Sequence, residues 1–150
     1  MNTKNKYSIK ENLVHPVLFS SIRDTLTGDT FYWFYNDFVN YRPCEGYKFT
    51  NEIVKNSNLT SSVFINYLNM VRFNLFLKTP TPQKYVIDNH KKDSKIGILF
   101  ANTCDGGIEI DNNFIEAEEN KLVLFDSSTE YKVVTSTKNK IFTYTLINYE

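Results

Sequence analysis

Residues 121–149 read KLVLFDSSTEYKVVTSTKNKIFTYTLINY, and this stretch indicates the fold. It holds three runs rich in Val, Ile, Thr, Tyr and Phe, at residues 121–125, 131–135 and 141–149. These residue types are enriched in β-strands, whereas the Asp, Ser and Asn residues between the runs are typical of turns. Short strands at such close spacing indicate a β-sandwich or a jelly roll.

The same pattern extends upstream, where it predicts strands at residues 73–77, 85–87, 96–101 and 108–110. The segment TPTP at residues 79–82 is a stiff break between the first two of these strands. Asp105-Gly106 is typical of a hairpin turn.

The N-terminal third has a different pattern, with two predicted helices. Pro16 suits the start of a helix, and the apolar residues after it recur at helical spacing. In residues 51–71, Ser61 offers a cap, and an apolar stripe follows it: Val63, Phe64, Tyr67, Leu68 and Val71. Residues 30–35 (TFYWFY) and residues 13–15 are predicted to be strands, and residues 1–12 a flexible N-terminus. We therefore expect one domain over residues 13–150, mostly β (α+β), with two N-terminal helices bracing a jelly roll.

Composition narrows the function. The chain has 150 residues, of which 41% are hydrophobic and 15% aromatic, and its 17 basic and 17 acidic residues give a formal net charge of zero. Without an excess of basic residues, general nucleic-acid binding is not expected, but self-association or binding to a protein partner is expected.

Cys44 and Cys104 lie far apart without a CxxC motif, which is typical of a reducing compartment; a single buried disulfide between them is the alternative. No apolar run is long enough to span a membrane, and the N-terminus is too polar for a signal peptide, so we expect a cytoplasmic protein or, if viral, one of the host cytoplasm or virion.

Five pieces of sequence, in order along the chain, resemble one known family. FYWFY at residues 31–35 resembles an aromatic strand found in this family's short members from phages and marine bacteria. RFNL at residues 72–75 resembles the family's R-x-K-x-N-L strand. NTCDGG at 102–107 resembles its YLN…GG turn. NKLVLFDS at 120–127 resembles its FDS strand, and Thr137 with Asn148-Tyr149 resembles its closing strand. Over roughly residues 13–149 the chain thus resembles the prolyl-hydroxylase-like 2-oxoglutarate/Fe(II)-dependent oxygenases.

The resemblance implies a double-stranded β-helix and a site where two His and one carboxylate hold iron(II), with an Arg for 2-oxoglutarate. In this sequence Asp88 matches the carboxylate, but Val86 stands at the first His position and Tyr131 at the distal one. The Arg position falls on Phe142, with Lys140 two residues away on the same strand face. The resemblance therefore implies a degenerate site, with vestigial positions at these residues and no cofactor.

Three replacements of the missing groups remain open. Asp88 and His90 share a strand face by their spacing of two and would form a swapped ligand pair, unless residues 89–93 are a solvated loop. Glu130 would replace the distal His after a one-residue slip, or Tyr131 would bind as a phenolate against its ordinary pKa of about 10. Lys140 would replace the missing Arg and hold an anionic ligand, but as a single point charge, whereas the guanidinium of an Arg binds a carboxylate through two hydrogen bonds.

Other catalytic interpretations have little support. The only two His, His15 and His90, offer few candidates for a triad, and Ser127-Ser128 lacks a strand-to-helix elbow. Cys104 has no basic neighbour in sequence to lower its pKa and is predicted to be an unreactive thiol.

The sequence therefore predicts a catalytically degenerate oxygenase-fold protein that acts as a binding or structural component, of phage origin if it follows the members that it resembles. The alternative is an active, non-standard Fe(II)/2-oxoglutarate-dependent hydroxylase that uses Asp88, His90 and Tyr131 or Glu130.

Overall fold

The computed structural model describes residues 6–28, 34–35, 40–41, 68–86 and 93–149. One helix lies in these ranges, α1 (Pro16–Thr27). The strands in these ranges are β1 (Tyr7–Lys10), β2 (Phe34–Tyr35), β3 (Asn40–Tyr41), β4 (Leu68–Leu77), β5 (Lys84–Val86), β6 (Lys95–Phe100), β7 (Gly107–Ile110), β8 (Asn113–Glu116), β9 (Leu122–Asp126), β10 (Tyr131–Val134) and β11 (Ile141–Tyr149).

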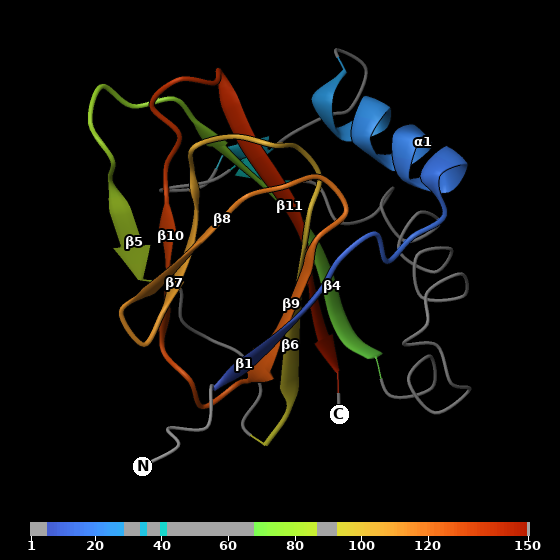
Figure 1. The fold of residues 1–150 in the computed structure, drawn as a ribbon, viewed down its shortest axis with the longest axis vertical. Helices are drawn as coiled ribbons and strands as arrows, with labels where there is room; N and C mark the ends of the chain where they lie inside the picture. The colour runs from blue at the N-terminus through green and yellow to red at the C-terminus, as the bar shows by residue number, and fades with distance from the viewer. Residues whose placement is uncertain (1–5, 29–33, 36–39, 42–67, 87–92, 150) are drawn as a thin grey trace.

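The described strands form two antiparallel sheets that face each other as a flattened barrel (Figure 1). The larger sheet has the order β1-β9-β6-β11-β4-β3-β2, and the smaller one has the order β5-β10-β7-β8. Successive strands along the chain from β4 to β11 alternate between the two sheets, except for the β7–β8 hairpin. This is the mostly β, double-stranded β-helix (jelly-roll) architecture that the sequence predicts.

Strand β11 occupies the centre of the larger sheet because its sequence suits burial on both faces. It pairs with β4 on one side and with β6 on the other, so that Tyr144 lies opposite both Asn74 and Phe100. All its residues from 142 to 148 are buried. The apolar and Thr residues that alternate along it thus fill two different cores.

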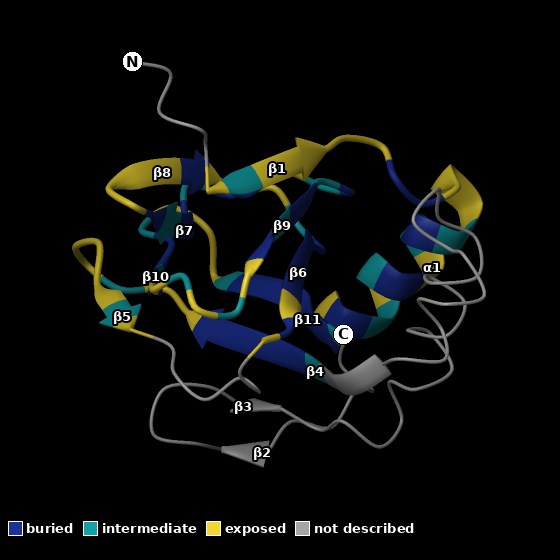
Figure 2. Cartoon of the chain, turned by 90° about the horizontal axis from the view of Figure 1, so that it is seen from below, coloured by how far each residue is buried: buried dark blue, intermediate teal, exposed yellow. Residues whose placement is uncertain are grey.

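The first core lies between the sheets and the second lies under α1. The helix begins at Pro16, where a proline loses no hydrogen bond, and the His15 Nδ1 accepts a hydrogen bond of 3.3 Å from the Val17 amide. Its buried face packs on the outer side of the larger sheet, where the described cluster comprises Leu13, Val14, Phe19, Ile22, Leu26, Phe73, Leu99, Ala101 and Leu122. Figure 2 shows this helix on one side of the larger sheet and the smaller sheet on the other.

The helix prediction needs correction in one part. Only one helix is described, because most of the second predicted helix falls outside the described residues. Its last residues, 68–71, belong to β4 instead, where Leu68 pairs with Tyr149 and Val71 pairs with Ile147. Pairing with a long central strand has overridden the helical spacing of these apolar residues.

Three other local predictions also differ from the structure. Residues 7–10, expected in a flexible N-terminus, form β1 along the edge of the larger sheet. Residues 13–15 form no strand. The hairpin turn lies not at Asp105-Gly106 but at Asp111-Asn112, where both residues have positive φ angles (52° and 64°), as type I′ turns require.

No helix in the described ranges is long and apolar enough to cross a membrane.

Candidate functional site

The space between the two sheets is the candidate site, because the resemblance places the oxygenase ligands there. Side chains alternate along a strand, so every second residue of β4 and β11 points into this space. From β11 these are Phe142, Tyr144 and Leu146, and from β4 they include Asn74 and Phe76. Whether a ligand fits depends on what these side chains leave open.

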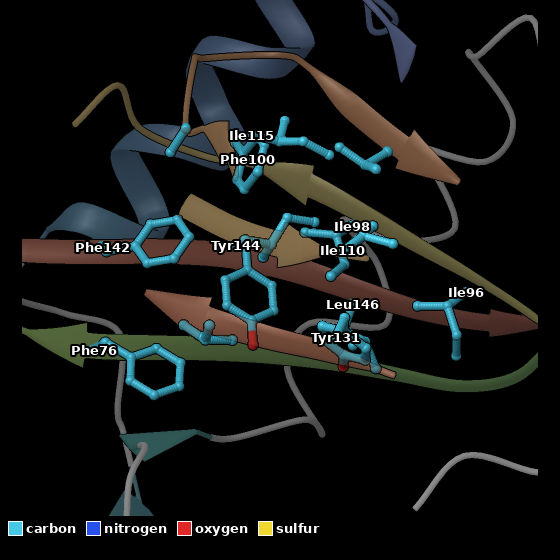
Figure 3. Packing of buried hydrophobic residues seen from close by; sticks show 14 of the residues in the cluster. Phe76, Ile96, Ile98, Phe100, Ile110, Ile115, Tyr131, Phe142, Tyr144 and Leu146 are labelled. Atoms are coloured by element: carbon cyan, nitrogen blue, oxygen red, sulfur yellow. The ribbon is translucent and has the colours of Figure 1, made fainter. Parts of the chain in front are cut away.

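Aromatic rings fill the middle of the barrel (Figure 3). The Phe142 ring centroid lies 5.4 Å from that of Tyr144, 6.4 Å from that of Phe76 and 5.8 Å from that of Phe100. Tyr85, from the smaller sheet, stacks on Phe76 at 5.9 Å and joins the two sheets. Centroid separations of about 4.5–7 Å are those of rings in direct contact. The barrel interior at this level is a packed core.

Tyr131, the first residue of β10, belongs to the same core. Its ring meets that of Phe125 edge to face, with centroids 5.0 Å apart, and only 1% of the residue is exposed. The position at which the resemblance expects the distal His therefore holds a buried side chain that packs against its neighbour.

Phe142 is likewise completely buried, at 0% exposure. Lys140, two residues earlier, is exposed in the turn before β11 and does not enter the barrel. The structure thus brings Phe142 and Tyr131 into one hydrophobic core, while it leaves Lys140 in solvent. No positive charge from this strand reaches the interior.

Val86 does not face the barrel. It lies opposite Lys132 on β10, and directly opposite residues of an antiparallel pair share a face. Tyr131 and Val133 of β10 belong to the interior cluster, so Lys132 and Val86 point outward, and Val86 is 45% exposed. The inward residue of β5 is Tyr85. The structure thus does not bring Val86 together with Tyr131.

Asp88 and His90 lie outside the described residues, so their pairing stays a prediction. Glu130 is exposed and lines a polar surface hollow of about 340 Å³ instead of the interior. The other lining residues of this hollow are Lys6, Glu109, Asp111, Asn112, Ser128, Thr129 and Lys132. Among the described residues, no group of three or more His, Cys, Asp or Glu side chains is placed to hold a metal ion.

Two polar groups lie inside the aromatic core. Tyr144 is fully buried opposite Asn74, and neither the Tyr144 hydroxyl nor Asn74 Oδ1 has a hydrogen-bond partner among the described residues. Burial raises the pKa of the Tyr144 hydroxyl, and the facing Asn74 and the nearby Arg72 offset only part of this effect. Tyr144 therefore stays neutral and acts as a packing residue.

Asp105 is a structural residue that the sequence analysis missed. Its carboxylate accepts hydrogen bonds from the hydroxyls of Ser136 and Thr137, both at 2.5 Å, and from the amides of Thr137 and Lys138. Burial alone would raise the pKa of the Asp105 carboxyl, but these hydrogen bonds together outweigh it and hold the pKa well below its usual range. The carboxylate thereby fixes the turn that leads into β11.

Cys104, beside it, is buried, and burial is the main cause that raises the pKa of its thiol. A raised pKa keeps the thiol protonated at neutral pH, in agreement with the predicted unreactive thiol.

Comparison with known proteins rests on structure alone. No family model matches the sequence, and no curated protein matches it. Solved structures do match. A prolyl hydroxylase from Trichoplax adhaerens, in complex with a hypoxia inducible factor oxygen degradation domain peptide, superposes with a TM-score of 0.66 at 11% identity, covering 97% of this chain and 84% of that one.

Two further structures give the same fold. The non-heme alpha-ketoglutarate-dependent carbocyclase SnoK from nogalamycin biosynthesis has a TM-score of 0.67 at 10% identity, over 96% of this chain and 79% of that one. The viral collagen prolyl hydroxylase of Paramecium bursaria Chlorella virus-1 has a TM-score of 0.56 at 10% identity, over 97% and 90%. The chain therefore has the fold of the 2-oxoglutarate/Fe(II) oxygenases.

The described residues at the expected ligand positions do not fit iron(II) and 2-oxoglutarate. Val86 and Phe142 carry no donor atom, and Val86 points away from the barrel. Tyr131 is packed against Phe125, and Phe142, at the position where the resemblance expects the Arg, is packed against Phe100.

Proposed function

We propose that this protein has kept the oxygenase fold without the iron chemistry and acts as a binding or structural component. The observation that supports this proposal best is the filled barrel, in which Phe142 touches Phe76, Phe100 and Tyr144. An oxygenase needs an open space there for its co-substrate, whereas a binding protein needs only the rigid scaffold. The cytoplasm, or the host cytoplasm or virion if the gene is viral, is the expected place of action.

The energetics favour a core that stays closed. A buried Phe contributes on the order of 3–5 kcal/mol relative to Ala, so displacing the Phe142 ring to admit a ligand would cost a large part of the stability of a domain. A carboxylate placed beside such rings would also lose its hydration without gaining a positively charged partner from β11.

The test is binding of iron(II) and of 2-oxoglutarate to the purified protein under anaerobic conditions, by calorimetry and thermal unfolding. We expect no heat of binding and no change in melting temperature. A ligand present at 100 times its dissociation constant would stabilise the fold by about 2.7 kcal/mol, or several degrees. The viral collagen prolyl hydroxylase, run in parallel, is the positive control. Iron-dependent conversion of 2-oxoglutarate to succinate would overturn the proposal.

The variants Asp88→Ala and His90→Ala separate the proposal from the hydroxylase alternative. If the protein acts by binding, each variant should show the same response to iron(II) as the parent chain, which is none. If the parent chain binds iron(II) and both variants lose that binding, these two residues are ligands and the proposal fails.

A further inference from the structure

The outer face of the smaller sheet carries a regular pattern of charged and apolar side chains. Helix α1 covers the outer side of the larger sheet, but no helix in the described ranges covers the smaller sheet, which lies on the opposite side of the barrel (Figure 1). Two large apolar side chains are exposed on it, Val86 at 45% and Phe114 at 47%.

Strand register places the side chains of this face in two rows. The first row, read across β5, β10, β7 and β8, is Val86, Lys132, Glu109, Phe114. The second row, in the same order, is Lys84, Val134, Gly107, Glu116. Val134 and Gly107 are buried, so the second row presents its two charged ends, Lys84 and Glu116.

Each row is complementary to a second copy of itself placed over it in the reverse order, because unlike charges or apolar side chains then lie opposite each other. A two-fold axis parallel to the strands brings two copies face to face, with β5 of each over β8 of the other and β10 over β7. Lys132 then meets Glu109 of the second copy, and Lys84 meets Glu116. Val86 meets Phe114 at both ends of the first row. The exposed Val86, Phe114, Lys84 and Glu116 thus each face an apolar partner or an opposite charge, and the half-buried Lys132 and Glu109 face each other, as an isologous contact requires.

We propose that this face is a contact surface for a second copy of the chain, giving a two-fold symmetric dimer. The positive charges lie on β5 and β10 and the negative charges on β7 and β8, so one half of the surface attracts the other half of its copy. Within one chain, Lys84 Nζ already lies 2.7 Å from Glu109 Oε2, and the dimer extends this ion pair into a network of eight charges. The inference does not depend on the loss of iron chemistry, because the outer face lies across the sheet from the barrel interior.

The size of the face indicates a weak dimer. Four strands about 4.8 Å apart and about four residues long cover roughly 250 Å² per copy in projection, below the roughly 800 Å² per partner of a standard interface. We therefore expect a dissociation constant in the micromolar to millimolar range, with stronger dimerisation at low salt.

Sedimentation velocity of the full chain between about 10 µM and 1 mM, concentrations chosen to span that range, tests the dimer. The variants Lys132→Glu and Glu109→Lys each place like charges against each other, and each alone should weaken dimerisation by at least about tenfold. An equimolar mixture of the two variants places opposite charges together again and should recover the dimer. Lys10→Glu on β1, away from this face, is the matched control and should dimerise like the parent chain.

A parent chain that stays monomeric throughout this range overturns the proposal. A dimer that neither charge variant weakens overturns it as well, because the contact then lies on another surface. Recovery of the dimer only in the mixture supports it, even where a single variant is less stable, because the mixture contains the same two folded chains.

Discussion

The side-chain amide of Asn120 forms two hydrogen bonds with the backbone of Val14. Its Oδ1 accepts a hydrogen bond of 2.9 Å from the Val14 amide, and its Nδ2 donates one of 2.7 Å to the Val14 carbonyl. Both residues are buried, and Asn120 has a φ angle of 63°, which Asn tolerates better than most residues. This contact ties the segment that leads into α1 to the turn before β9.

We expect Asn120→Ala to lower the free energy of unfolding by about 2–3 kcal/mol, because it leaves two buried backbone groups without partners. Urea denaturation measures the change. Asn112→Ala is the matched control, since Asn112 also has a positive φ angle (64°) but is exposed in a turn. A loss no larger than that of the control would mean that the hydrogen bonds contribute nothing beyond the backbone preference.

Phe142→Ala should lower the free energy of unfolding by about 3–5 kcal/mol, because it removes a ring that touches three others in the core. The neighbouring substitution Ile141→Ala, at a partly exposed position, should cost clearly less. Similar losses for both would show that the interior is open enough to relax around the missing ring.

Tyr144→Phe should leave stability at neutral pH unchanged or slightly higher, because the hydroxyl is buried without a hydrogen-bond partner among the described residues. The difference should grow in alkali. Burial raises the folded-state pKa of Tyr144 above its unfolded value of about 10, so the unfolded chain loses this proton more readily than the folded one, and the stability of the parent chain falls as pH rises from about 10 toward the folded-state pKa. Stability of the parent chain should thus fall more steeply above pH 10 than that of the variant.

The control for this comparison is Tyr7→Phe, on edge strand β1, measured over the same pH range. If Tyr144→Phe destabilises the protein at pH 7, its hydroxyl has a partner in solution, and the packing role fails.

Asp105→Asn should destabilise the protein at neutral pH, by about 1–3 kcal/mol, because an amide accepts fewer of the four hydrogen bonds that the carboxylate receives. Hydrogen bonding lowers the folded-state pKa below the unfolded value of about 3.9, so this stability is present above that value and is lost as pH falls toward the folded-state pKa. The gap between parent and variant should therefore narrow below about pH 4. Asp24→Asn, an exposed carboxylate on α1, is the control.

Particular elements show what the sequence could predict. Residues 141–149 form the predicted strand end to end because β-branched and aromatic residues dominate them, with aromatic residues and Thr alternating at 142–145. Strand β8 escaped prediction because Ile115 is its only buried residue, and β1 escaped because it is an edge strand with one partner. Both are defined by long-range pairing that local composition does not encode.

The candidate site could be placed only in part. Counting back from Asn148-Tyr149 put Phe142 at the expected Arg position, and the structure has its side chain in the core between the sheets. Counting in β5 put Val86 at a ligand position, but a shift of one residue turns a strand position to the other face, and Tyr85 points inward instead. The packing of Tyr131 on Phe125 could not be predicted from the sequence, because the two residues lie on strands of different sheets and meet only in the folded barrel.

The pairing of β1 with β9 also sets an order for folding during synthesis. Residues 7–10 pair with residues 122–125, so β1 stays unpaired with β9 until synthesis has passed residue 125, on the order of ten seconds at typical translation rates. Contacts so distant in sequence form late and slow the search for the native topology. A nascent strand with both edges open is prone to aggregate, and Lys10 at the end of this exposed strand is the kind of residue that opposes edge-to-edge pairing.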